Sequence, residues 1–464
     1  MKLQNSIILF IVLLISYTKS INPKPRHIPQ FVFGRPYGGF LNRPDGSNNE
    51  EDISCGSNNI SYEEGWITQP LDHFDLNNTI SWQQYYHYSF DLYNGSGLVF
   101  FMLGGETPLR ARFICNTGYH WMVWAKQYGA AVFQIEHRYF GQSRPRVDQS
   151  VQNLQWFTPE QILEDYNDFI QQMNVKFFSN ITKPRWVMFG GSYPGTLTAW
   201  MRTVYPDLTI GGIASSGAIG LTVNQYSYAV NMQKDYGSND PNCASNIKAA
   251  FTQMQTMVYS ETGRQVLEIL FNLCTPFPSS DKLTPKDIQF FFSNIFGVFQ
   301  GINQYTGDNG NTATANGLGI PITCQIMNNV SETDLVKRIA NVINWSNSFS
   351  PGSQNVCMPN SYSDYIWTYK QPEYDTYAEI AAARSWNWMC CSYMGYFQTT
   401  DGGHDNDIWG RQDNLANNVT AMIINRNAHC ADMYPSSPND NMELIAARTR
   451  IQGLLEGFIQ ANKL

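Results

Sequence analysis

The chain has 464 residues, of which 43% are hydrophobic and only 15% charged, which excludes a disordered protein and is enough to bury a large core. The net charge is −8 at pH 7 and the Lys and Arg residues form no basic block, which argues against a nucleic-acid partner. Histidines and cysteines do not occur at metal-ligand spacing, so no metal site is predicted.

The first 20 residues predict a secretory signal peptide. A charged start at Lys2 precedes the apolar run 7–16, and small residues follow near Ser20. The run is too short to span a membrane, so we expect no membrane attachment after its removal. Residues 21–60 are rich in Pro, Gly, Asn and Arg without apolar periodicity, which predicts a poorly ordered leader or an exported propeptide.

Export makes the N-x-S/T sequons and the cysteines informative. The expected glycosylation sites are Asn59, Asn77, Asn94, Asn180, Asn329, Asn344 and Asn418. Nine cysteines are spread along the chain, and in an oxidising compartment we expect most of them to pair, with one left over.

Strand and helix patterns then alternate from 61 to 219, which predicts a parallel α/β sheet. The expected strands are 97–103, 130–135, 185–189 and 208–215, with a helix over 157–173 and an aromatic, half-buried strand over 82–93. Residues 220–380 read as a mostly helical insertion, with helices over 247–259, 263–271, 285–299 and 334–343. Residues 381–464 are predicted to form the second part of the α/β core, with a strand over 420–424 and a helix over 441–459.

Ser192 is the candidate nucleophile. The buried strand 185–189 ends at two glycines, Ser192 follows at the turn, and a helix begins behind it. This arrangement is typical of a nucleophile elbow, in which the hydroxyl stands at the carboxyl edge of a sheet and the next N–H, that of Tyr193, points at a developing oxyanion. Pro194 occupies the second glycine position of the G-x-S-x-G pattern, and Gly195 comes one residue later.

The general base and the acid should follow the serine in the chain, in the order acid and then histidine. Only His404 and His429 lie after Ser192, and His429 is favoured because it closely follows the expected strand 420–424. The acid stays open among the aspartates of the loop 401–413.

With these residues in view, the chain resembles peptidase family S28, which comprises lysosomal prolyl carboxypeptidase, dipeptidyl peptidase II and the thymus-specific serine protease. The blocks that carry the resemblance are QPLDHF at 69–74, EHRYFGQS at 136–143, GGSYPG at 190–195 and AHCADM at 428–433. The elbow proline and the histidine segment are most similar to the thymus-specific branch.

The resemblance implies an α/β-hydrolase fold with an inserted, mostly helical cap domain, and a peptidase that uses no cofactor. It assigns Ser192 as nucleophile, His429 as base and Asp407 as acid, with Asp405 as second choice. A second oxyanion donor would come from the backbone near Gly104, Gly105 and Glu106. Family members carry several tens of residues more before the acid, including a strand, so the acid is Asp407, Asp405 or absent with that strand.

The sequence therefore predicts a secreted or lysosomal serine exopeptidase that cleaves short peptides, with cleavage after proline implied by the resemblance. Two alternatives stay open, a lipase or esterase and a catalytically impaired α/β-hydrolase that serves in binding. We expect peptide substrates as partners, while assembly as a monomer or a homodimer is left open.

Overall fold

The computed structural model describes residues 60–307, 317–349, 357–374, 378–398 and 430–461, together with two short strands near the N-terminus. Its centre is a six-stranded sheet in the order β3-β4-β6-β5-β7-β8. The strands are β3 (Glu63–Pro70), β4 (Ser81–Ser89), β5 (Leu98–Met102), β6 (Ala131–Ile135), β7 (Arg185–Gly191) and β8 (Gly211–Ser215). This strand order, with a helix directly after β7, is that of an α/β-hydrolase fold, as the sequence predicts.

The predicted parallel arrangement is confirmed for four strands but not for the edge that β3 and β4 form. β6, β5, β7 and β8 run parallel, but β3 pairs with β4 and β4 with β6 in antiparallel orientation. The reason is the short connection from β3 to β4, closed by the Leu71 N–H to Ile80 carbonyl hydrogen bond of 2.8 Å, which leaves no room for a crossover. β4 is more buried than the half-buried strand expected, because side chains that cover the sheet pack on it; Tyr86, for example, lies edge-on to Phe169 with ring centroids 5.1 Å apart.

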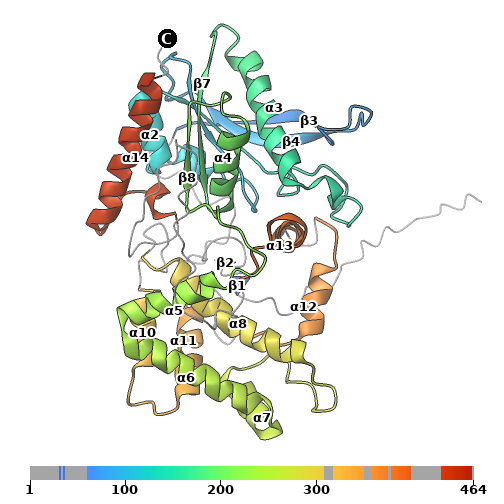
Figure 1. Ribbon diagram of the computed structural model, residues 1–464, viewed down its shortest axis with the longest axis vertical. Helices are drawn as coiled ribbons and strands as arrows, with labels where there is room; N and C mark the ends of the chain where they lie inside the picture. The colour runs from blue at the N-terminus through green and yellow to red at the C-terminus, as the bar shows by residue number, and fades with distance from the viewer. Residues whose placement is uncertain are drawn as a thin grey trace, which may run out of the picture.

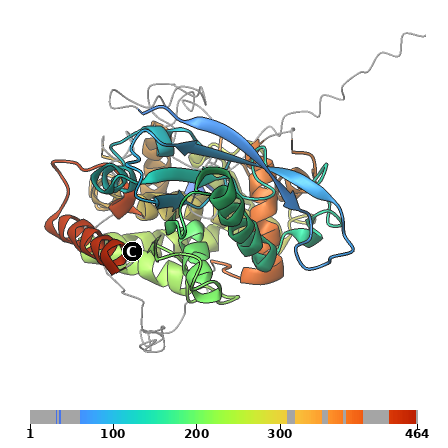
Figure 2. The same cartoon turned by 90° about the horizontal axis from the view of Figure 1, so that it is seen from above.

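Helices cover both faces of this sheet (Figures 1 and 2). α3 (Pro159–Phe177) and α4 (Tyr193–Val204) pack on one face, where Phe169 and Leu197 join the core with Phe101 and Phe133. α2 (His120–Tyr128) and α14 (Met442–Ala461) pack on the other face over Phe100 and Phe189. We call these strands and helices the sheet half.

A separate core forms the helical half, which lies beside the sheet half in Figure 1. Its helices are α5 (Ser227–Asn239), α6 (Pro241–Val258), α7 (Glu261–Leu270), α8 (Pro285–Gln304), α10 (Ile320–Met327) and α11 (Leu335–Asn347). The four helices that the sequence predicts here are α6, α7, α8 and α11, and they are confirmed within a few residues at most ends.

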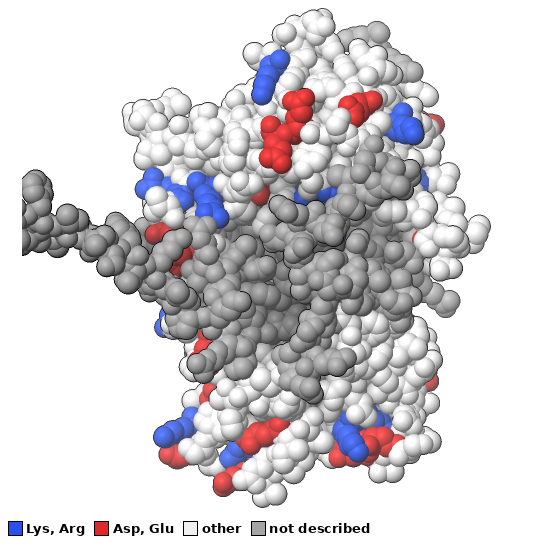
Figure 3. Space-filling view, turned by 180° about the vertical axis from the view of Figure 1, so that it is seen from behind, with Lys and Arg blue, Asp and Glu red and all other residues white. Residues whose placement is uncertain are grey.

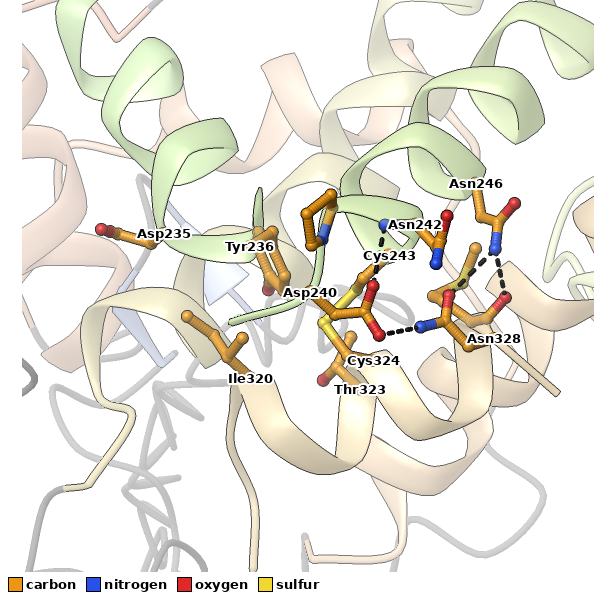
Figure 4. Close-up of a disulfide and its surroundings, with 12 residues drawn as sticks. Asp235, Tyr236, Asp240, Asn242, Cys243, Asn246, Ile320, Thr323, Cys324 and Asn328 are labelled. Carbon is orange, nitrogen blue, oxygen red and sulfur yellow. Dashed lines mark hydrogen bonds between the residues drawn. A yellow bond between two sulfur atoms is a disulfide. The ribbon is translucent and has the colours of Figure 1, made fainter. Parts of the chain in front are cut away.

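Disulfides hold the helical half together. Cys243 on α6 bonds to Cys324 on α10, and Cys274 bonds to Cys357. Figure 4 shows the first bond beside Asp240, which caps α6 through the Asn242 N–H at 2.8 Å and accepts a hydrogen bond from Asn328 at 2.7 Å. The disulfide therefore joins two helices that the Asp240–Asn328 hydrogen bond also links.

The count of unpaired cysteines differs from the expectation. Cys115 is also disulfide-bonded, but Cys390, Cys391 and Cys430 are free thiols, where one was expected. Burial raises the pKa values of the Cys390 and Cys430 thiols to about 12, so each behaves as a small apolar side chain. The odd total fixes only that at least one cysteine is unpaired; it does not say how many.

Several shorter elements complete the chain. They are β1 (Phe31–Val32), β2 (Arg35–Pro36), α1 (Arg112–Cys115), η1 (Leu154–Trp156), α12 (Tyr362–Tyr369), α13 (Ala378–Met389), the π-helical η2 (Cys390–Met394) and η3 (Ala431–Met433). β1 and β2 pair antiparallel within the expected leader and contact α8. The expected signal peptide and the strand 420–424 lie outside the described residues.

Candidate active site

Ser192 occupies a sharp turn between β7 and α4. Its backbone has φ 63° and ψ −130°, a conformation that side-chain-bearing residues rarely adopt and that costs on the order of 1–3 kcal/mol. The Ser192 N–H donates to the Ser215 carbonyl at 2.9 Å, which ties the turn to the end of β8. The side chain is partly exposed and makes no capping bond to α4. The predicted elbow is therefore present, and its hydroxyl does not cap the helix behind it.

The glycines around Ser192 allow the tight turn. A Cβ on Gly190 would lie 2.1 Å from the Pro194 carbonyl oxygen, and one on Gly195 would lie 2.7 Å from the Ser215 carbonyl oxygen. Pro194 itself sits in the first turn of α4, where its missing N–H has no intrahelical partner to lose. The turn therefore tolerates proline at the second glycine position of G-x-S-x-G, because the Ser215 backbone approaches Gly195 rather than residue 194.

The loop after β5 lies against the elbow. A Cβ on Gly105 would lie 2.6 Å from Cγ of Pro194, and the Tyr166 hydroxyl donates to the Gly104 carbonyl at 3.0 Å. Burial, and then the nearby Glu106 carboxylate, raise the pKa of the Tyr193 phenol. The structure therefore brings together Tyr193, Gly105 and Glu106, the residues predicted to supply oxyanion donors.

The segment that follows position 429 docks at the same place. The Cys430 N–H donates to the Ser216 hydroxyl at 3.1 Å, and a Cβ on Gly191 would lie 3.0 Å from Sγ of Cys430. Asp432 accepts a hydrogen bond of 2.5 Å from the Ser215 hydroxyl. Burial raises the pKa of Asp432, against the opposing effects of that bond and of Arg448.

Position 429 is adjacent in the chain to this docked segment, whereas His429 itself, His404, Asp405 and Asp407 lie outside the described residues. The predicted base and acid therefore remain predictions.

A buried ion pair lies behind the sheet edge. Arg138 donates to Asp165 through Nε at 2.5 Å and through Nη2 at 2.6 Å, and His73 Nε2 lies 2.8 Å from the same carboxylate. Burial alone would raise the pKa of Asp165, but the combined effect of Arg138 and His73 is larger and opposite, so the pKa lies below its usual value. Sequence reasoning missed Asp165, because nothing in a helix pattern singles out one acidic residue.

These contacts explain two of the sequence blocks that carried the resemblance. Gln69 donates to the backbone carbonyl of Asp165 at 2.8 Å, and His73 contacts the Asp165 carboxylate, so the QPLDHF block contacts this residue through two side chains. Arg138 belongs to the EHRYFGQS block, whose Glu136 instead accepts backbone N–H groups. Both blocks build the frame of the sheet edge.

Charged side chains and possible metal ligands bear on the expectations from the sequence. On the face in Figure 3, Lys and Arg side chains are interspersed with Asp and Glu. In the part of the chain that the structure covers, no group of three or more His, Cys, Asp or Glu side chains could hold a metal ion. No described helix has the length and apolar character needed to cross a bilayer.

The sequons can be placed in part. Asn77, Asn94, Asn180, Asn329 and Asn344 are exposed, while Asn59 and Asn418 lie outside the described residues. Exposure leaves room for a glycan at each of the five, and glycosylation itself remains a prediction.

Known proteins show similarity along most of the chain. Residues 69–413 and 406–451 match the family model described as Serine carboxypeptidase S28. A Caenorhabditis elegans protein named serine protease is 34% identical, over 93% of this chain and 91% of its own. Human lysosomal Pro-X carboxypeptidase is 24% identical, over 84% of this chain and 86% of its own.

Two details of these comparisons bear on the predictions. The family match divides into two segments that meet at 406–413, the region where the sequence lacks the stretch expected before the acid. Among solved structures, Pyrococcus horikoshii acylaminoacyl peptidase is 16% identical with a TM-score of 0.26, over 36% of this chain and 25% of its own, which is too low to bear on function. The thymus-specific branch stays a prediction.

Proposed function

The chain belongs to the Serine carboxypeptidase S28 family and is a serine peptidase, and from this premise we propose that it is an exopeptidase with Ser192 as nucleophile and His429 as general base. The observation that carries the proposal is the elbow, in which Ser192 is held at φ 63° with its hydroxyl not used as a helix cap. A strained residue whose side chain does not cap the helix behind it is typical of a reacting group.

The proposed reaction has two steps. Ser192 Oγ attacks the peptide carbonyl while His429 takes its proton and passes it to the leaving amine, and water then hydrolyses the acyl-enzyme. Tyr193 is the first residue of α4, so its N–H has no hydrogen-bond acceptor within the helix. This N–H would stabilise the oxyanion together with the backbone at Gly105 or Glu106. Asp407, or Asp405, would orient His429.

The names of relatives support the proposed action at a chain end and the proposed preference for proline. Human lysosomal Pro-X carboxypeptidase is named for cleavage next to proline, and we carry this preference to the present chain as part of the proposal. The helical half would act as a cap domain, with boundaries at 219/220 and 380/381, that admits only a chain end or a short peptide.

The compartment is part of the same proposal. The disulfides Cys243–Cys324 and Cys274–Cys357 require an oxidising environment, and lysosomal relatives are among the similar proteins. Together with the signal predicted at 1–20, they support a secreted or lysosomal enzyme. The proposal further takes the enzyme to act on peptides without a cofactor, as a monomer or a homodimer.

The decisive experiment compares Ser192→Ala with Ser245→Ala, an exposed serine on α6. Each protein is incubated with X-Pro-X peptides that have free, N-acetylated or C-amidated ends. We expect Ser192→Ala to lose at least about 10³-fold in kcat and Ser245→Ala to match the wild type. Loss of cleavage only when one end is blocked identifies the end that is read. A Ser192→Ala protein as active as the wild type would end the proposal.

The impaired-hydrolase alternative is favoured by the interruption of the family match at 406–413. A fluorophosphonate probe separates the two, because labelling needs an activated hydroxyl. We expect Ser192 to be labelled and His429→Ala to prevent it. Slower labelling in Asp407→Asn or in Asp405→Asn would identify the acid, and an unlabelled wild type would favour a binding role.

A further inference from the structure

Glu136, His137 and Arg138 follow β6 directly, and all three are at most 1% exposed. They reach three different parts of the molecule. Arg138 pairs with Asp165, as described above. The other two reach the two loops on which the proposed oxyanion donors lie, which gives this short segment a connection to the chemistry that its burial alone would not suggest.

Glu136 ties down the loop after β5. Its Oε1 accepts the Leu109 N–H at 2.9 Å, and its Oε2 accepts the N–H groups of Gln142 at 2.8 Å and Ser143 at 2.7 Å. Burial raises the pKa of Glu136, and these N–H groups oppose the rise. A carboxylate can accept all three bonds, whereas the amide of glutamine would turn a donor toward one of them.

His137 holds the elbow through a defined tautomer. Its Nδ1 lies 2.8 Å from the Arg138 carbonyl oxygen, which can only accept, so Nδ1 carries the proton. Nε2 of the neutral ring is then an acceptor, and the Tyr193 hydroxyl donates to it at 3.2 Å. Trp386 also packs edge-on against Tyr193, with ring centroids 5.3 Å apart.

The two loops also meet this segment through backbone packing. A Cβ on Gly104 would lie 2.9 Å from the His137 backbone nitrogen, while one on Gly105 would lie 2.6 Å from Cγ of Pro194. The loop after β5 is therefore wedged between the end of β6 and the first turn of α4.

We propose that Glu136 and His137 are positioning residues that hold the two halves of the oxyanion hole at a fixed separation. Glu136 acts on the loop that carries Gly105 and Glu106, and His137 acts on Tyr193. The inference rests on the proposed function, because it presupposes attack by Ser192. Donors that are fixed in advance stabilise the transition state more than the bound substrate, so their displacement lowers kcat and leaves KM almost unchanged.

The test uses Tyr193→Phe, His137→Asn and the double variant. Asn at 137 keeps a donor near the position of Nδ1 and removes the Nε2 acceptor. The control is Tyr236→Phe in the helical half, which also deletes a buried hydroxyl bond, that from Tyr236 to the Phe299 carbonyl at 2.9 Å. Steady-state kinetics on a cleaved peptide are combined with inhibition by a peptidyl boronate, which mimics the tetrahedral species, and by the product peptide.

We expect each single variant to lower kcat and boronate affinity by about tenfold, with KM and product affinity changed by less than about twofold. The double variant should be no slower than the slower single variant, because both remove the same bond. Glu136→Gln should show the same split between kcat and KM. Tyr236→Phe should keep the wild-type constants.

Wild-type kcat and boronate affinity in Tyr193→Phe and His137→Asn would overturn the inference, as would an equal loss in Tyr236→Phe. Tyr193→Phe removes one hydroxyl and keeps the ring, so its constants decide the matter even if Glu136→Gln does not fold. Ser192→Ala separates the two proposals. If it is inactive while the tyrosine and histidine variants are normal, only the positioning role fails.

Discussion

The two halves of the molecule are stabilised in different ways. The helical half has an apolar core joined by Cys243–Cys324 and Cys274–Cys357, and α8 starts at a complete capping box of Thr284 and Asp287. The sheet half buries charged and polar side chains beneath the candidate site, and α4 starts at a strained serine with no side-chain cap. The half with the candidate chemistry therefore contains both the Arg138–Asp165 ion pair and the strained Ser192 backbone.

The largest expected effect comes from breaking the buried ion pair of the sheet half. Asp165→Asn leaves Arg138 buried without its charge partner, and we expect the free energy of unfolding to fall by about 3–5 kcal/mol. Urea unfolding followed by tryptophan fluorescence measures the loss.

The matched control is Glu332→Gln, which breaks an ion pair with Lys337 at the solvent-exposed start of α11. Exposed pairs contribute little because water and salt screen them, so its unfolding midpoint should stay at the wild-type value. Equal losses in the two variants would show that burial does not distinguish the pairs, and the proposed contrast between the halves would be wrong.

The sequence predicted this division unevenly, for physical reasons. Some elements could be predicted from a short stretch of sequence, because their own apolar residues show a continuous run or a helical spacing. These are the strands β5, β6 and β7 and the helices α3, α6, α8 and α14. The antiparallel edge formed by β3 and the helices α2 and α13 were not predicted. Their identity depends on which distant elements cover them.

The candidate site shows the same limit. Ser192 was predictable because Gly190, Gly195 and the strand before them are local requirements of a sharp turn. Two contacts of the site join residues that are far apart in the chain, and no rule of local spacing predicts them. They are Arg138 with Asp165 and His137 with Tyr193. The resemblance identified these blocks as characteristic but did not say that Arg138 and Glu136 make structural contacts.

Acid should destabilise the sheet half more than the helical half, because residues 220–380 contain no histidine while the sheet half buries His87 and His137. Burial lowers the pKa of His87 to about 4 from its usual 6.5. The unfolded chain therefore binds a proton that the folded chain refuses between these values, and stability is lost as the pH falls from about 6.5 to about 4. In the folded protein Nδ1 of His87 accepts from Gln134 at 2.8 Å, which protonation forbids.

Over this pH interval, the free energy of unfolding of His87→Gln should fall by about 2–3 kcal/mol less than that of the wild type, as measured by urea unfolding at each pH. The raised pKa values of Glu136 and Asp432 act in the opposite direction, but both proteins contain these groups, so the difference isolates His87. Hydrogen exchange at pH 4 should show earlier loss of protection in β4 and β6 than in α6 and α8. Parallel pH profiles of the two proteins would contradict this.

The smallest effects concern the starts of α4 and α8. Thr284 accepts the Asp287 N–H at 3.3 Å while Asp287 accepts the Thr284 N–H at 2.9 Å, so Thr284→Ala should cost about 1 kcal/mol. Ser192 offers no such bond and sits at φ 63°, where glycine is unstrained. Ser192→Gly should therefore raise the free energy of unfolding by about 1 kcal/mol while peptide cleavage is lost.

Thermal unfolding of the two variants beside Ser192→Ala provides the check. Alanine keeps the backbone strain and removes only the hydroxyl, so it should be inactive with nearly wild-type stability. If Ser192→Gly is destabilised as Thr284→Ala is, the strain at Ser192 is not a cost carried for function. If it is stabilised and inactive, the chain tolerates an unfavourable backbone at this residue for the position that it gives the hydroxyl.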